Sequence, residues 1–347
     1  MKKILLVSHE MTYTGAPRSL LNIAKILLRL NYEVSVYTLE DGNFKREYEK
    51  IGLSVQRVPE KKQWLQLLKE YDVAIFNTIF TLSLCIESQN IIRSILYIRE
   101  AENIPDIGIG SGIPVENIKN IKEAICLSEY AKAFIMAKYR PKKLTVIHNF
   151  VNDEYHGELN LIKNSTINFM ISGTVEWRKG HDNVINAYLC MPEELRRISQ
   201  LHIVGRMPEW SKPFWNHLIP KDEPSIIYHG EISDEKERIS LYKRMNVFIV
   251  ASRDEACSLV ALEGAMLGKA LILSENTGAK YLDVDGKYIY TTEDIGALSR
   301  KMCQLTSRKE LIIRGGKMRR QYLKTSTSKK YEAQIKKIID GEENRIH

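Results

Sequence analysis

The stretch VFIVASRDEACSLVALEGAMLGKALILSENTGAKYLD, residues 247–283, says most about the fold. An apolar run of strand length over 247–250 leads into a polar loop that contains Glu255. A helical segment over 257–268 follows, and then a second apolar run near 270–274. A strand, a helix and a strand in this order are typical of a βαβ unit, whose two strands lie parallel in one sheet.

The same alternation extends on both sides of this stretch. It predicts further strands near 3–8, 33–39, 53–58, 72–77, 94–98, 123–127, 144–147, 167–172, 200–205 and 225–229. It predicts further helices over 17–30, 61–70, 81–92, 129–139, 181–190, 234–245 and 309–340. Because strands and amphipathic helices alternate, the sequence predicts an α/β fold built on parallel sheets.

The length and one polar stretch predict two domains. A chain of 347 residues exceeds what a single core usually serves. Residues 149–166 are polar, rich in Asn and without periodicity, which is typical of an interdomain linker, and the strand pattern restarts after them. We therefore expect one domain over 1–155 and a second over 156–315.

Composition and charge limit the class of protein. The chain is 44% hydrophobic and 27% charged, which is typical of a globular protein and argues against a disordered or fibrous one. A net charge of +8 favours anionic partners: phosphorylated substrates, nucleic acid or an anionic membrane surface. Basic residues gather in the last predicted helix, as a solvated face or as one attracted to a membrane: Arg314, Lys317, Arg319, Arg320, Lys324, Lys329, Lys330, Lys336 and Lys337.

The cysteines and the N-terminus bear on the compartment. The five cysteines are scattered and never form a CxxC pair, which argues against a disulfide framework and a zinc site. A reducing, cytoplasmic environment is therefore expected. The first apolar run is interrupted by His9 and Glu10, far below the length of a signal peptide or membrane span, and predicts a first strand.

Glycine-containing loops follow the first strand of each half. Gly15 precedes a helix whose N-terminus favours anions, although an ordinary tight turn also explains a glycine there. In the second half, the loop over 173–180 holds Arg178 and Lys179, which either neutralise a leaving diphosphate or stay solvated. Gly205 repeats this arrangement more weakly, and the full GxGxxG fingerprint of dinucleotide binding is absent.

Glu255 and Glu263 are two candidate ligand-binding carboxylates with seven residues between them. Carboxylates accept hydrogen bonds from sugar hydroxyls, and eight helical steps of roughly 12 Å suit an extended ligand such as a nucleotide sugar. The amides of Cys257, Ser258 and Leu259 at the helix start are suited to bind phosphate. Alternatively, Glu255 is a charge favoured by the helix dipole and Glu263 a surface residue.

These motifs resemble the retaining glycosyltransferases of family 4, also called glycosyl transferases group 1. The similarity covers nearly the whole chain and rests on GAPRSL at 15–20, Ile147-His-Asn149-Phe-Val-Asn152, Gly173 to Gly180, Tyr228-His-Gly230, Ser252, Glu255, Glu263, Ala265-Met266, Gly268-Lys269 and Thr277-Gly278. It implies the GT-B fold, in which two Rossmann-like domains face a central cleft. The N-terminal domain would bind the acceptor and the second the nucleotide sugar, and a C-terminal helix over 316–347 would pack back on the first.

The resemblance also implies roles for single residues. Glu255 contacts the transferred sugar, Glu263 the nucleotide ribose and Lys179 the diphosphate, while Gly15 lies near the phosphates and the acceptor. No metal ion or other cofactor is required, and the nucleotide sugar is a co-substrate. Anomeric configuration is retained by front-face attack, in which the leaving phosphate helps to accept the acceptor's proton and no nucleophilic carboxylate is needed.

The chain departs from the family pattern at three places. Thr174 replaces an arginine, so that Lys179 and Arg178 carry the phosphate charge, and residues 256–258 read Ala-Cys-Ser in place of Gly-Phe-Gly. A histidine that the first domain often supplies is missing after the strand near 94–98. The expected substitutes on the acceptor side are Arg99 and Glu100, with His9 as a further candidate or a structural histidine.

The resemblance thus implies a retaining hexosyltransferase. A UDP-sugar is the default donor, the acceptor is a saccharide, a lipid-linked sugar or a protein, and the pathway is polysaccharide or glycoconjugate biosynthesis. The basic last helix favours a peripheral position at the inner face of a membrane. Three alternatives stay open: a nucleotide-sugar 2-epimerase of the same fold, a non-catalytic partner of another glycosyltransferase, and a nucleic-acid-binding protein, for which no motif is present.

Overall fold

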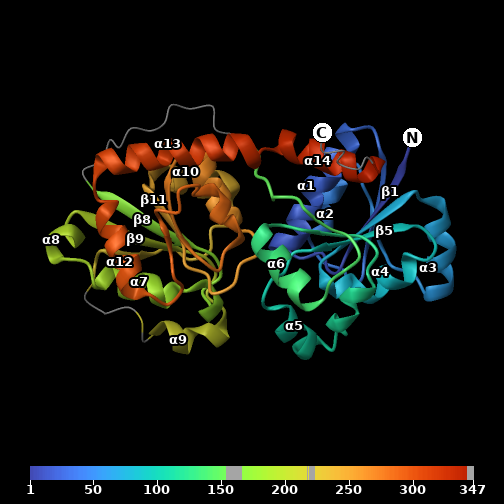
Figure 1. The fold of residues 1–347 in the computed structure, drawn as a ribbon, viewed down its shortest axis with the longest axis horizontal. Helices are drawn as coiled ribbons and strands as arrows, with labels where there is room; N and C mark the ends of the chain where they lie inside the picture. The colour runs from blue at the N-terminus through green and yellow to red at the C-terminus, as the bar shows by residue number, and fades with distance from the viewer. Residues whose placement is uncertain (154–165, 217, 219–222, 342–347) are drawn as a thin grey trace. The chain divides into compact units, whose positions relative to one another are not determined.

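The computed structural model describes residues 1–153, 166–216, 218 and 223–341, and Figure 1 shows its elements. The chain forms two compact units: one comprises Met1–His148 with the segment from Tyr331 onward, and the other Asn149–Lys330. The boundary expected at residue 155 and most of the predicted linker lie outside the described residues.

The first unit contains a seven-stranded parallel sheet with the strand order β3-β2-β1-β4-β5-β6-β7. Its strands are β1 (Lys3–Ser8), β2 (Glu33–Thr38), β3 (Val55–Arg57), β4 (Val73–Asn77), β5 (Arg93–Ile98), β6 (Ala124–Cys126) and β7 (Leu144–Val146). Its helices are α1 (Gly15–Arg29), α2 (Lys45–Glu49), α3 (Lys61–Leu67), α4 (Leu82–Ser88), α5 (Ile104–Ser111), α6 (Glu129–Lys138) and, from Tyr331 on, α14 (Ser328–Asp340). β4 is buried throughout, as a central strand covered on both faces requires.

The second unit contains a six-stranded parallel sheet with the order β10-β9-β8-β11-β12-β13. Its strands are β8 (Ile167–Ser172), β9 (Ser199–Val204), β10 (Ile226–Tyr228), β11 (Val247–Val250), β12 (Ala270–Ser274) and β13 (Ile289–Tyr290). Its helices are α7 (His181–Leu189), α8 (Glu193–Arg196), α9 (Lys212–Asn216), α10 (Glu235–Arg244), α11 (Leu259–Met266), α12 (Ile295–Gln304) and α13 (Arg308–Thr325). Within this unit, α7 and α12 lie on one side of the strands and α10 and α13 on the other (Figure 1).

Both sheets are doubly wound, which confirms the predicted α/β, Rossmann-like class. The strand order reverses between β1 and β4 in the first unit and between β8 and β11 in the second. In open α/β sheets, ligands bind outside the carboxyl ends of the strands at such a reversal. The loops after these four strands are therefore where site residues are expected.

The helical region predicted over 309–340 is broken in the structure. α13 ends at Thr325, and Thr327 starts α14 by accepting a hydrogen bond of 3.3 Å on its Oγ1 from the N–H of Lys330. A hydroxyl side chain that satisfies a helix N–H favours such a restart. The second unit consequently continues to Lys330, and the segment that joins the first unit begins at Tyr331 rather than at 316.

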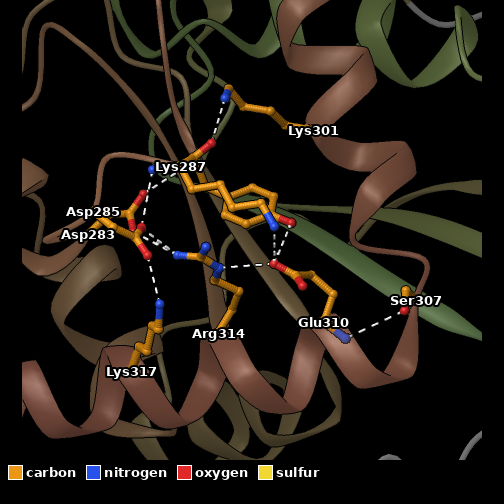
Figure 2. Close-up of polar contacts among 9 residues, drawn as sticks. Asp283, Asp285, Lys287, Lys301, Ser307, Glu310, Arg314 and Lys317 are labelled. Atoms are coloured by element: carbon orange, nitrogen blue, oxygen red, sulfur yellow. Dashed lines mark hydrogen bonds and ion pairs between the residues drawn. The ribbon is translucent and has the colours of Figure 1, made fainter.

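Ion pairs and a buried tyrosine hold the two helices to their units. On α13, the Arg314 guanidinium pairs with Asp285 at 2.6 Å and with Asp283 at 3.4 Å, both outside the helix (Figure 2). On α14, the buried Tyr331 hydroxyl donates to the Tyr97 hydroxyl of β5 at 3.3 Å. No helix within the described residues has the length and apolar character needed to cross a membrane.

Candidate active site

Glycines let the loops after β8 and β9 approach each other closely. Gly205 has a φ of +145°, and a Cβ on it would lie 1.8 Å from the Gly173 carbonyl oxygen. The Gly173 N–H donates to the Val204 carbonyl at 2.9 Å, and the Gly205 N–H to the Gly230 carbonyl at 2.8 Å. Backbone packing therefore requires glycine at 205, while contact of Gly173 or Gly205 with a donor stays a prediction.

A third glycine sets the position of the cationic loop. Gly180 has a φ of +71° and separates the short 3-10 turn Trp177–Lys179 from α7. A Cβ at Gly180 would lie 2.1 Å from the Ala251 carbonyl oxygen, so only glycine allows this approach to the chain after β11. The Arg253 N–H donates to the Arg178 carbonyl at 2.8 Å and fixes the two loops to each other.

Lys179 and Glu255 form an ion pair at the strand reversal of the second unit. The Lys179 Nζ donates directly to Glu255 Oε2, and Arg178 Nη1 lies 3.7 Å from the same oxygen. Arg178 also pairs with Glu176 at 2.7 Å and donates to the Asp254 carbonyl at 3.0 Å. The structure thus brings together three residues that the sequence assigned to one donor site.

The surroundings keep Glu255 ionised. Burial acts to raise the pKa of its carboxyl, but the charges of Lys179 and Arg178 outweigh burial, and the pKa lies below its ordinary value. The Glu255 N–H donates to the Asn276 carbonyl at 3.0 Å, and its carbonyl accepts from Gly278 at 2.7 Å. This backbone anchoring holds the loop in place although its next residues are not glycines.

The start of α11 is capped by its own chain. Ser258 is the N-cap residue, and its Oγ accepts a hydrogen bond of 3.3 Å from the Ala261 N–H. Leu259 is the first residue of the helix, and Cys257 is buried. The helix begins two residues later than the sequence predicted, because the serine side chain ends the preceding loop. Phosphate binding by the amides of residues 257–259 stays a prediction.

Glu263 lies on α11 and is only 8% exposed. Its Oε1 accepts a hydrogen bond from the Arg238 guanidinium of α10. The alternative of a surface glutamate is therefore wrong, because the carboxylate is buried and paired with a cation. Arg238 was not among the residues that the sequence suggested. A Glu and an Arg separated by 25 positions on two helices leave no local spacing signal.

In the first unit, His9 and Thr78 meet at the strand reversal between β1 and β4. The Thr78 Oγ1 and the His9 Nδ1 are 3.2 Å apart, and the His9 ring stacks on Phe80 at 5.0 Å. Thr78 has a φ of +77°, which is unusual for a β-branched residue and typical of functional sites. Burial lowers the pKa of His9, although the neighbouring carboxylate of Glu10 acts to raise it.

Arg99 and Glu100 lie directly after β5, next to this pair. The Arg99 guanidinium stacks 4.2 Å from the Tyr97 ring centroid and donates through Nε to Asn77 Oδ1. The Glu100 carboxylate accepts hydrogen bonds from the N–H groups of Arg99 at 2.9 Å and Ile79 at 3.4 Å. Burial raises the pKa of Glu100 to about 7, despite these hydrogen bonds.

Gly15 is the first residue of α1, and a Cβ there would meet nothing within 4 Å. The structure therefore gives no packing reason for a glycine at this position. The same helix start is tied to the site of the first unit, because the Asn77 side-chain amide donates to the Ala16 carbonyl at 3.2 Å. A ligand contact at Gly15 stays a prediction.

Family models match two parts of the sequence. Residues 166–308 match the model described as glycosyl transferases group 1, and residues 1–88 match glycosyl-transferase family 4. The chain belongs to this glycosyltransferase family. The resemblance inferred from the Glu255 and Glu263 block is confirmed. Comparison with curated proteins gives no significant match.

Several solved structures share the fold of this chain. HepE from Anabaena, in complex with UDP and glucose, is 17% identical, with a TM-score of 0.78 over 98% of this chain and 100% of that one. A glycosyltransferase from Rickettsia africae is 17% identical, with a TM-score of 0.81 over 98% of each chain. WaaG, a glycosyltransferase involved in lipopolysaccharide biosynthesis, is 16% identical, with a TM-score of 0.74 over 97% and 100%. These likenesses confirm the GT-B fold.

Among the residues that the structure describes, no group of three or more His, Cys, Asp or Glu side chains is arranged to hold a metal ion. The structure adds three residues that the sequence did not suggest, because they contact the candidate residues: Asn77, Thr78 and Arg238. A non-glycine residue with positive φ leaves no mark in the sequence, since it shows only in the backbone conformation.

Proposed function

We propose that this glycosyltransferase moves a hexose from a UDP-sugar to a saccharide, lipid-linked or protein acceptor with retention of anomeric configuration. The observation that carries the proposal is the Lys179–Glu255 ion pair at the strand reversal of the second unit. The complex of HepE with UDP-glucose supports a UDP-sugar as the donor. The pathway proposed is polysaccharide or glycoconjugate biosynthesis.

The cations of the second unit suit a leaving diphosphate. In the proposed reaction, the bond from the sugar C1 to the diphosphate oxygen breaks while the acceptor oxygen bonds to C1 on the same face. The acceptor's proton passes to the leaving phosphate, whose charge Lys179 and Arg178 stabilise. Because Lys179 is already paired with Glu255, the incoming diphosphate would compete for the ammonium and leave Glu255 to accept the sugar hydroxyls.

The first unit supplies the proposed acceptor side. His9 and Arg99 offer hydrogen-bond donors at the strand reversal, and Glu100 offers a carboxyl whose pKa of about 7 lets it exist in both protonation states near neutrality. A group of this kind is suited to assist proton movement. Direct participation of Glu100 in the chemistry is part of the proposal.

Two further parts of the proposal concern the surroundings of the enzyme. The reaction needs no metal ion or other cofactor, so transfer should survive dialysis against EDTA, and restoration of a lost activity by Mg²⁺ or Mn²⁺ would contradict this. We also place the protein in the cytoplasm at the inner membrane face, attracted by basic side chains such as Lys309, Arg320 and Lys324 of α13. Failure to bind vesicles with anionic lipid at low salt would contradict the membrane part.

A donor screen tests the proposed function. The full chain is incubated with a panel of UDP-, GDP- and ADP-sugars, and nucleotide release and thermal shift are recorded. Transfer predicts stabilisation by one nucleotide class and release that depends on an acceptor. Conversion of a UDP-sugar without any acceptor would show a 2-epimerase instead, and absence of any response would indicate a non-catalytic partner.

A further inference from the structure

The carboxylate of Glu263 is held by a residue from a neighbouring helix. Its side chain is 10% exposed, and the Arg238 guanidinium of α10, 22% exposed, donates to its Oε1. A buried carboxylate stays charged only where a cation or several donors compensate the loss of water. Arg238 therefore stabilises the charge and restrains the direction of a group that would meet a ligand.

Arg238 is itself fixed from several sides. Its guanidinium lies 5.6 Å from the Tyr242 ring centroid, and its Nη2 lies 3.7 Å from the exposed Glu235 carboxylate. Burial acts to lower the pKa of Arg238, but the charge of Glu263 outweighs burial, and the pKa lies above its ordinary value. The guanidinium is therefore held in its charged form.

The contact chain ends at the loop that carries the cations. The buried Tyr242 hydroxyl and the Ser172 Oγ share a hydrogen bond of 2.7 Å. Ser172 is the last residue of β8 and directly precedes Gly173, where the cationic loop begins. One connected set of side chains thus runs from Glu263 on α11, through Arg238 and Tyr242 on α10, to the end of β8.

We propose that Arg238 is a positioning residue for nucleotide recognition: it holds Glu263 as an oriented carboxylate that accepts hydrogen bonds from the ribose hydroxyls. This inference rests on the proposed function, in which Glu263 binds the ribose. Selectivity for a ribonucleotide over a deoxyribonucleotide then depends on a residue of α10 that touches no part of the ligand.

The test measures hydroxyl discrimination rather than affinity alone. Dissociation constants of the full chain are measured for UDP, GDP and ADP, and for the 2′-deoxy and 3′-deoxy forms of the nucleotide that binds. Loss of a hydroxyl that meets a carboxylate should weaken wild-type binding roughly tenfold or more. In Arg238→Gln, ribonucleotide affinity should fall about tenfold and the ribo-to-deoxy ratio should approach one. Arg238→Lys, which keeps the charge, should restore part of that ratio.

Arg196→Gln is the matched control, because Arg196 is similarly exposed at 25% and pairs with Glu223 at 2.9 Å elsewhere in the same unit. It should keep the wild-type ratio. An unchanged ribo-to-deoxy ratio in Arg238→Gln would overturn the proposal. If both forms lost affinity equally, Arg238 would act on a phosphate contact instead. If the wild type binds a nucleotide without hydroxyl discrimination, the ribose role is wrong. If it binds none, the proposed function itself fails.

Discussion

At the scale of single residues, charge pairing decides what each candidate can do. Glu255 is ionised because Lys179 and Arg178 lie beside it, and this engagement favours a binding role over a nucleophilic one. The Glu100 carboxylate accepts hydrogen bonds from backbone N–H groups, and burial raises its pKa although the Arg99 charge and these hydrogen bonds act to lower it. Glu255 and Glu100, which each follow a strand of one of the two sheets, therefore bind a proton with different affinity.

Glu255→Ala should separate nucleotide binding from transfer. Nucleotide affinity should hold or rise, because Lys179 loses a competing partner, while the transfer rate should fall roughly 100-fold through loss of contacts to the sugar. Isothermal titration with the nucleotide and an initial-rate assay check the two parts. Glu223→Ala, which removes a glutamate of similar exposure from an ion pair with Arg196, serves as control. Unaltered turnover in Glu255→Ala would place the sugar site elsewhere.

Glu100→Gln should change how stability depends on pH. The folded-state pKa of about 7 lies above the ordinary 4.5, so the folded state binds the extra proton between these values. Wild-type stability should therefore fall as pH rises from 5 to 8, by up to about 3 kcal/mol from this group. The glutamine variant keeps the shape and should lack this part of the decline. Chemical denaturation at both pH values measures it, and parallel declines would show that Glu100 does not titrate there.

At the scale of elements, glycine and ion pairs determine where loops and helices lie. Gly205 lets the loop after β9 pack on the loop after β8, and Gly180 lets the loop after β8 pack on the chain after β11, because any Cβ at either glycine would clash with backbone atoms. α13 is attached through Arg314, whose side chain is 5% exposed and pairs with Asp283 and Asp285 outside the helix (Figure 2). The glycines and the Arg314 ion pairs thus each determine the position of a whole loop or helix.

Gly205→Ala should disturb the donor-side loop more than the loss of one hydrogen atom suggests. The new Cβ would lie 1.8 Å from the Gly173 carbonyl at a φ of +145°, so the backbone has to move. We expect a loss of at least about 2 kcal/mol in the free energy of unfolding, together with weaker nucleotide binding. Gly15→Ala, where nothing lies within 4 Å, should fold with wild-type stability. Equal stability of both variants in urea unfolding would contradict this account.

Arg314→Met should destabilise the second unit by roughly 3–5 kcal/mol, because Asp283, 1% exposed, would lose its cation while buried. Lys317→Met is the matched control. Lys317 pairs with Asp285 at 2.7 Å, but both side chains are about two-fifths exposed, at 43% and 41%, so the cost should stay below about 1 kcal/mol. Urea denaturation of the three proteins checks the order, and similar losses for both variants would show that burial of the pair does not matter.

At the scale of the whole molecule, the C-terminal segment completes the first unit. Tyr331, Ile335 and Ile339 of α14 are each at most 2% exposed. The Lys2 ammonium pairs with Asp340 at 3.1 Å, so α14 also contacts the segment that leads into β1. The N-terminal part therefore lacks a share of its core until the rest of the chain has been made.

Removal of the chain after Thr327 should weaken the first unit and spare the second. The truncated protein exposes the surface that α14 covers on the first unit, including Tyr97 of β5, while the second unit keeps α13. Hydrogen exchange should accelerate for amides of β5 and stay slow for amides of β8 and β9. Tyr331→Phe, which loses one hydroxyl contact, should show only a small effect. Equal acceleration in both sheets would mean that the units unfold together.

Much of the fold follows from local pattern. The strands β1, β4, β8 and β11 lie where their apolar runs predict them, because a buried parallel strand needs an uninterrupted apolar segment. The helix α5 was not predicted, because its eight residues include one proline and two glycines and show no clear helical period. The strand β13 was not predicted, because two residues are too few to show any period. The break at Ser326 was missed because helical segments continue on both sides of it and only the hydroxyl of Thr327 marks the restart.

The α/β class, the family and the Glu255 and Glu263 block can be read from the amino-acid sequence, because they depend on short-range periodicity and on motifs along the chain. Which charges meet follows from the three-dimensional fold instead. Lys179 reaches Glu255 across 76 positions, and Arg238 reaches Glu263 from another helix. The winding of the doubly wound sheet brings these side chains together, and no local sequence pattern specifies the partner of a distant charge.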